Sequence, residues 1–123
     1  MSDVVTDNAG EAMKAQLRRD LRAAMKWGDK DETGVLRELV AALDNAEAAP
    51  LRSERPSVDR HSFNDGSAEG VRRLLTQEDV QAVMMGEMKA RVESSAEYAR
   101  LGAEARSIAL NAEIRILRRY LQR

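Results

Sequence analysis

The 123 residues of this chain are enough for one domain of ordinary size and too few for two. Hydrophobic residues make up 43% of the sequence and aromatic residues only 3%, so the core must consist mostly of aliphatic side chains and methionine, which favours helices over a sheet. The lack of cysteine excludes disulfides, thiolate nucleophiles and Cys-ligated zinc, and a formal net charge of -1 excludes a general electrostatic attraction to nucleic acid. We therefore expect one all-α domain in which any contact with a polyanion depends on local basic patches.

The first ten residues are interpreted as a flexible N-terminal tail. They are acidic and lack the basic-then-apolar pattern of a secretory signal. No apolar run approaches the ~20 residues that a membrane-spanning helix needs. Together with the lack of cysteine, these features predict a cytoplasmic protein with no membrane partner.

The first helical hairpin is predicted over 11–48. A first helix is expected over 11–27, because Met13, Leu17, Leu21 and Met25 recur every four residues. Gly28 is expected to end this helix in the left-handed conformation, and Asp29 to cap the next one. The second helix, closed by Pro50, has a broad apolar face made of Val35, Leu36, Leu39, Val40 and Leu43. So short a turn predicts an antiparallel pair.

The segment 51–75 is polar, turn-rich and aperiodic, and it is predicted to be a long loop. A connection of this length is either a mobile loop with no specific role or a functional element, and its composition leaves both open.

A second hairpin is predicted to follow the loop. Thr76 and Asp79 have the spacing of a capping box, which opens a third helix that reaches Leu101. The apolar positions of this helix are Val80, Val83, Met84, Met88 and Val92. Glu87 and Arg91 are expected to pair on its exposed side, and Gly102 marks its end.

The fourth helix is expected from Ala103 to the end of the chain. Its apolar face comprises Leu110, Ile114, Leu117 and Leu121, widened by Ile108, Ala112, Ile116 and Tyr120. The predicted architecture is therefore a small bundle of about four helices, arranged as two helical hairpins joined by the long loop.

Two basic rows are candidates for nucleic-acid binding. Four cations in the first helix lie at a spacing of four residues, namely Lys14, Arg18, Arg22 and Lys26. A second set, Arg115, Arg118, Arg119 and Arg123, lies beside the apolar face of the fourth helix. Such rows could follow a phosphate backbone in a salt-dependent manner. Alternatively they are solvated flanks that pair with acids on neighbouring helices or complement the helix dipole.

Trp27 and Met85 are candidates for binding a protein partner. Trp27, the only tryptophan, either covers one end of the bundle or anchors a partner. Met84, Met85 and Met88 form a soft cluster, in which Met84 and Met88 are expected in the core and Met85 is expected to be more exposed.

No catalytic or metal-binding constellation is recognisable in the sequence. His61 is the only histidine, and it lies in the predicted loop without a nucleophile or orienting carboxylate beside it. The glycines form no phosphate-binding motif. We therefore predict that the chain is not an enzyme and that it needs no cofactor and no metal.

Two blocks of sequence resemble the GatB/YqeY family. The first block begins with Leu21-Arg22-Ala23-Ala24-Met25-Lys26 and Gly28-Asp29-Lys30, and continues with Val35-Leu36-Arg37, Ala41-Ala42-Leu43 and Asn45-Ala46-Glu47. The second comprises Thr76-Gln77-Glu78-Asp79-Val80, then Lys89, Arg91 and Glu93-Ser94, and finally Ala112-Glu113-Ile114, Leu117 and Tyr120-Leu121. This family consists of helical proteins similar to the tail of the B subunit of tRNA-dependent amidotransferases.

The resemblance implies a non-catalytic helical domain over 11–123 that binds tRNA or assists tRNA-dependent amidotransfer. The family continues through a proline into a small C-terminal domain, which is expected to be absent here because the sequence ends at Arg123. A second reading is a protein–protein interaction or regulatory module without a nucleic-acid role. Neither reading specifies the oligomeric state, and a homodimer is compatible with both.

Overall fold

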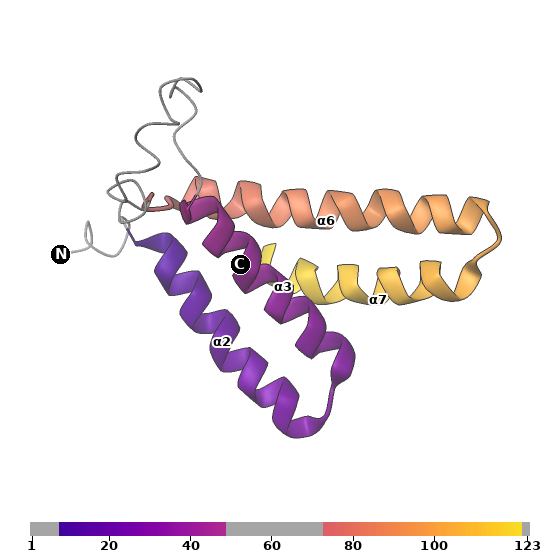
Figure 1. Cartoon of the computed structure of the whole chain (residues 1–123), viewed down its shortest axis with the longest axis horizontal. Coiled ribbons are helices and arrows are strands. Elements are labelled where there is room, and N and C mark those ends of the chain that lie inside the picture. The colour runs from indigo at the N-terminus through magenta and orange to yellow at the C-terminus, as the bar shows by residue number, and fades with distance from the viewer. Residues whose placement is uncertain (1–7, 49–72, 122–123) are drawn as a thin grey trace, which may run out of the picture.

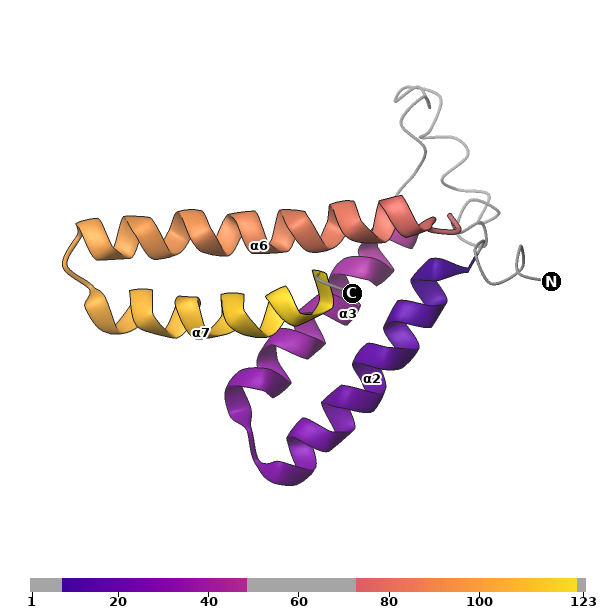
Figure 2. The same ribbon diagram turned by 180° about the vertical axis from the view of Figure 1, so that it is seen from behind.

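In the computed structural model, the described residues are 8–48 and 73–121, and they form four helices in two antiparallel hairpins. The first hairpin pairs α2 (Ala9–Trp27) with α3 (Lys30–Ala48), and the second pairs α6 (Gln77–Arg100) with α7 (Glu104–Leu121). The predicted all-α fold is confirmed. Figure 1 shows the α2–α3 hairpin lying obliquely across one end of the α6–α7 hairpin, and Figure 2 shows the same arrangement from behind.

The turn between α2 and α3 follows the predicted chemistry. Gly28 has φ 75°, the left-handed conformation that closes a helix, and the Asp29 N–H donates to the Ala24 carbonyl at 2.9 Å. The Asp29 carboxylate in turn accepts from the Glu32 N–H at 3.0 Å, as expected of a capping residue. The Gly28-Asp29 pair therefore ends one helix and starts the next.

The α6–α7 hairpin is delimited in the same way. The Thr76 hydroxyl accepts from the Asp79 N–H, and the Asp79 carboxylate accepts from the Thr76 N–H, both at 3.0 Å, which confirms the capping box. The hydrogen bond from the Thr76 N–H is the main reason that the pKa of Asp79 lies below its usual value. Gly102, with φ 82°, lies in the turn that leads into α7.

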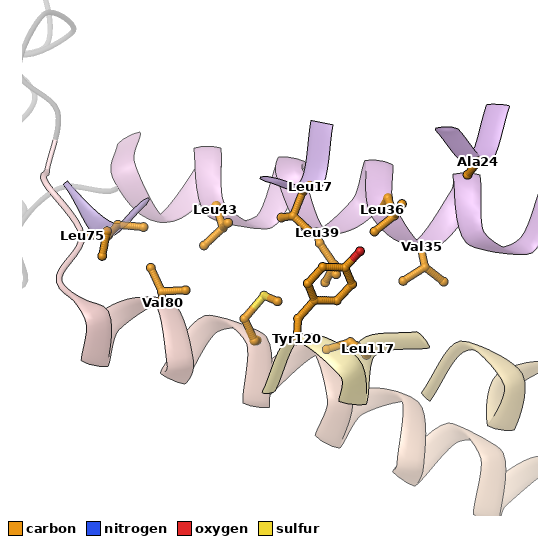
Figure 3. Packing of buried hydrophobic residues seen from close by; sticks show 12 residues of the cluster. Leu17, Ala24, Val35, Leu36, Leu39, Leu43, Leu75, Val80, Leu117 and Tyr120 are labelled. Atoms are coloured by element: carbon orange, nitrogen blue, oxygen red, sulfur yellow. The ribbon is translucent and has the colours of Figure 1, made fainter. Parts of the chain in front are cut away.

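The core lies where the two hairpins meet. α3 packs against both α6 and α7, and α2 also contacts α6. Figure 3 shows Leu117 and Tyr120 of α7 pointing toward Leu39 of α3. The side chains that are almost completely buried are Leu17, Val35, Leu36, Leu39, Leu43, Leu75, Val80, Met84 and Leu117.

Leu75 belongs to this core, although the sequence placed it at the end of the loop. It is only 1% exposed, and its carbonyl accepts from the Gly10 N–H at 3.3 Å. A Cβ atom at position 10 would lie 3.0 Å from the Leu75 Cβ, so the close contact favours glycine there. Helix α2 thus starts at Ala9, two residues earlier than predicted, because Leu75 covers its first turn.

Three apolar positions that were expected in the buried stripes are exposed. They are Met25 of α2, Val92 of α6 and Ile108 of α7. A stripe spaced by four residues drifts around a helix of 3.6 residues per turn, which carries Met25 away from the core. Val92 belongs to α6 and Ile108 to α7, the two helices of the hairpin that extends beyond α3 (Figure 1).

Several sequence predictions concern positions outside the described residues. They are the predictions for residues 1–7, for Pro50, for His61 and most of the long loop, and for Arg123.

Candidate functional site

Lys14 does not belong to an exposed basic row. Only 4% of it is exposed, and its Nζ atom lies 2.7 Å from Glu47 Oε1, 2.8 Å from Asp44 Oδ1 and 3.2 Å from Glu11 Oε2. Burial by itself lowers the pKa of Lys14, but the three carboxylates outweigh this effect and hold the pKa above its usual value. The expectation that Lys14 could contact a phosphate is therefore corrected: its charge is used to join α2 to α3.

The remaining cations of the first row are exposed on α2, and Arg19 lies on the same face of the helix. Arg18, Arg19, Arg22 and Lys26 all face solvent within a sector of about 100° of the helix circumference. We call these four residues the α2 basic face. Among the described residues, no carboxylate lies within ion-pair distance of any of them. Arg19 does not share the spacing of four residues that defines the predicted basic row, so the sequence pattern did not include it. A helical wheel nevertheless places Arg19 beside Lys26.

The second basic row is divided between two roles. Arg119 lies 2.8 Å from Glu32 and so ties α7 to the start of α3. Arg115 and Arg118 are exposed at the edge of a shallow groove between α6 and α7, and among the described residues neither has a carboxylate within ion-pair distance. Arg115 also borders a second hollow, of about 350 Å³, beside Asp31 and Glu32.

The two basic rows do not form one surface. The Tyr120 hydroxyl donates to Asp20 Oδ2 at 2.7 Å, which fixes the side of α2 that faces the end of α7. Arg18 and Arg22 each lie two residues from Asp20, which places them about 160° around α2 from it. The α2 basic face therefore points away from α7, and one nucleic-acid strand lying across both rows is not favoured by this geometry.

Arg91 is buried, although the Glu87–Arg91 pair was expected on an exposed side. The pair exists at 3.0 Å, but Arg91 is only 8% exposed and also contacts Glu113 Oε1 at 2.9 Å and Glu38 of α3. Burial lowers the pKa of Arg91, and its hydrogen bonds to Glu87 and Glu113 more than compensate. The guanidinium joins three helices because its five N–H groups can serve several carboxylates at once.

The two candidates for partner binding are exposed on separate elements. Trp27 is 82% exposed at the end of α2, so it does not cover the bundle. Met85 is 49% exposed on α6, while Met84 is completely buried and Met88 is partly buried against the core. The structure does not bring Trp27 and Met85 together in one patch, since they lie on different hairpins.

The carboxylates of the described residues gather mainly around cations. Those near Lys14 and Arg91 act as counter-ions, and within 8–48 and 73–121 no group of three His, Asp or Glu residues could hold a metal ion. None of the described helices has the length and apolarity to cross a membrane. Two features of the described surface remain without a role in the fold, the α2 basic face and the groove between α6 and α7.

Comparison with known proteins identifies the family. A family model described as Yqey-like protein matches residues 14–123, which include all four helices except the first turn of α2. No match was found among curated proteins or among solved structures. Because the matched region covers most of the sequence, the chain belongs to the YqeY-like family.

Proposed function

We propose that this protein is a non-catalytic binding module that binds RNA through the α2 basic face. The observation that supports the proposal is the clustering of four exposed cations, Arg18, Arg19, Arg22 and Lys26, with no ion-pair partner among the described residues. Elsewhere in the same bundle, Lys14, Arg91 and Arg119 are neutralised by acids from neighbouring helices. Among the described residues, carboxylates thus lie close to the cations that hold the fold, and none lies within ion-pair distance of the α2 basic face.

The geometry of this face suits a phosphate backbone. Arg18, Arg22 and Lys26 are separated by about 6 Å each along the helix axis, so the row is about 12 Å long. Guanidinium groups donate paired hydrogen bonds to phosphate oxygens. Binding of this type releases counterions and weakens as salt rises.

We take tRNA as the class of RNA to test. The resemblance of the two sequence blocks to the tail of a tRNA-dependent amidotransferase subunit suggests this class, and family membership fits a module that carries no chemistry of its own.

The test is tRNA binding to the wild-type protein and to two charge-matched double variants. In fluorescence anisotropy at 50 mM salt, Arg18→Glu with Arg22→Glu should weaken binding by about tenfold or more, because two phosphate contacts become repulsive. The control, Arg115→Glu with Arg118→Glu, has the same change in net charge on a different face and should bind tRNA within about twofold of the wild type.

Two results would contradict the proposal. The first is the absence of tRNA binding by the wild type at low salt, and the second is equal loss of binding in both double variants, which would indicate a nonspecific effect of net charge. A log–log plot of affinity against salt should have a slope of about -2 to -4, in keeping with three to four phosphate contacts. Circular dichroism of each variant should confirm unchanged helix content.

A further inference from the structure

The α6–α7 hairpin carries a groove between its two helices, lined by residues of these helices alone. The groove has a volume of about 450 Å³ and lies between one stripe of each helix. The α6 stripe comprises Val92, Ser95, Ala96 and Ala99, and the α7 stripe comprises Ser107, Asn111, Ile114, Arg115 and Arg118. Each set falls within a sector of about 100° of the helix circumference, so each follows one face of its helix.

The orientation of α6 leaves this groove open. Val80, Met84 and Arg91 are the positions through which α6 meets the core and Glu38 of α3. The groove positions Val92 and Ala96 lie about 100° and about 140° around the helix from Arg91. Figures 1 and 2 show the hairpin extending beyond α3, with no other described helix beside its far half.

The floor of the groove contains polar side chains that form hydrogen bonds with one another. The Ser95 hydroxyl lies 2.9 Å from the Ser107 hydroxyl and 2.8 Å from Asn111 Oδ1, so polar contacts join α6 and α7 there, beside the buried Ile114. Ala96 and Ala99 add little volume on the α6 side. A helix backbone could approach this floor closely, because small residues at a contact shorten the distance between helix axes.

Apolar side chains are exposed along the rest of the α6 stripe. Val92 is 46% exposed and Met85 is 49% exposed, and Met85 lies two turns before Val92 on the same face. From Met85 to Ala99 the stripe is about 21 Å long, which matches four turns of a second helix. A partner helix with apolar residues at a spacing of three and four would cover this length.

The edges of the groove are basic. Arg115 and Arg118 border it on α7, and Lys89 is exposed beside Val92 on α6. Among the described residues, none of these three cations has a carboxylate within ion-pair distance. An occupant that carries acidic residues beside its apolar stripe would complement both edges.

We propose that the α6–α7 groove binds an amphipathic α-helix of a partner protein, whose apolar face is flanked by Asp and Glu residues. Small apolar side chains of the partner pack on Ala96 and Ala99, and its carboxylates pair with Arg115 and Arg118. This site shares no residue with the α2 basic face, so the two kinds of binding can be tested separately.

The test uses two designed helical peptides with the same apolar face. One carries Glu at the flanking positions and the other carries Lys at those positions. Titrations of the full chain followed by NMR should show micromolar binding of the Glu peptide, with shifts concentrated in residues 85–118. The Lys peptide should bind at least about tenfold more weakly, because it places like charges beside Arg115 and Arg118.

Two variants make the result specific to the groove. Ala96→Glu should reduce binding of the Glu peptide by about tenfold or more, and Arg115→Glu with Arg118→Glu should reverse the preference between the two peptides. Arg18→Glu with Arg22→Glu is the matched control on the other hairpin and should change neither affinity by more than about twofold.

Three results would overturn the proposal. The first is equal binding of the two peptides to the wild type. The second is dimerisation of the chain at micromolar concentration in sedimentation, abolished by Ala96→Glu, since a second copy would then occupy the groove. The third is loss of tRNA binding in the Arg115 and Arg118 variant alone, which would assign these arginines to RNA and would also contradict the role proposed for α2.

Discussion

The two hairpins are built alike, yet they bury different kinds of side chain. In the first hairpin, Leu36, Leu39 and Leu43 of α3 are completely buried, because α3 lies between α2 and the second hairpin. In the far half of the second hairpin, the buried residues include Ser95 and Ser107, and Val92 is half exposed. A helical hairpin thus serves as core where a third helix covers it, and leaves an open groove where no described helix lies beside it.

Burial of a side chain in this protein depends on which other helices pack against it rather than on the apolar pattern within its own helix. Leu39 and Val92 are both aliphatic residues on helices with recognisable periodicity. Leu39 is fully buried because α3 crosses α7 at that point (Figure 3). Val92 is exposed because no described helix covers that side of α6. The largest effects of mutation are therefore expected at the crossing of the hairpins.

Leu39→Ala should be the most damaging single change. It leaves a cavity at the crossing of the hairpins and should lower the free energy of unfolding by about 3 kcal/mol, measured by urea denaturation followed by circular dichroism. The matched change Val92→Ala should cost no more than about 0.5 kcal/mol, because the side chain is already half solvated. Equal losses at the two sites would refute the distinction between the hairpins.

Arg91→Met should have the next largest effect. It removes the cation shared by Glu38, Glu87 and Glu113, and we expect a loss of about 2 kcal/mol, at the low end for a buried ion pair because the carboxylates are partly solvated. Arg118→Met is the control on the same hairpin and should be close to neutral. If both variants were equally stable, the contact of Arg91 with α3 would have no energetic role.

Tyr120→Phe tests the hydrogen bond that joins the end of α7 to α2. Loss of the bond to Asp20 should lower the free energy of unfolding by about 1.5 kcal/mol near neutral pH. Burial, and then Asp20, raise the pKa of Tyr120 above its usual value. Its contribution is therefore complete below about pH 10, the usual tyrosine pKa, and is lost as the pH rises beyond it. The stability difference between wild type and variant should narrow at alkaline pH, and a constant difference would argue against this linkage.

Thr76→Ala should have the smallest effect of this series, lowering the free energy of unfolding by about 1 kcal/mol or less, because it removes one hydrogen bond of the capping box.

The pKa of Asp79 is lowered in the fold, so the stabilisation by its carboxylate is present above the ordinary carboxyl pKa, about 3.9, and is lost as the pH falls through the lower folded value. Asp79→Asn should accordingly reduce the loss of stability on acidification. Unfolding curves recorded between about pH 2 and 7 would detect the difference.

The helices and their ends were predictable because they depend on local chemistry. Gly28 and Gly102 adopt the left-handed conformation that ends a helix at little steric cost, and the Thr76–Asp79 capping box spans only four residues. The spacing of the leucines in α3 also identified the buried face of that helix. Such signals extend over a few residues and need no knowledge of the rest of the chain.

The roles of the charged residues were not predictable in the same way. Lys14 and Arg22 share one spacing in one helix, but Asp44 and Glu47, about 30 positions further along the chain, bury Lys14 and leave Arg22 in solvent. Arg91 differs from the predicted exposed pair only because Glu38 and Glu113 reach it from two other helices. Which cations hold the fold and which can bind a ligand depends on partners that are distant in sequence.

The sequence by itself determined that the chain forms paired helices, that α2 ends at Gly28 and that α6 begins after Thr76, because hydrogen bonding and side-chain periodicity within a segment fix these features. The tertiary structure alone decided that the α2 basic face and the α6–α7 groove lie on different hairpins. The reason is that exposure results from the packing of one helix against another, and that packing places Leu75 in the core and leaves Val92 at the surface.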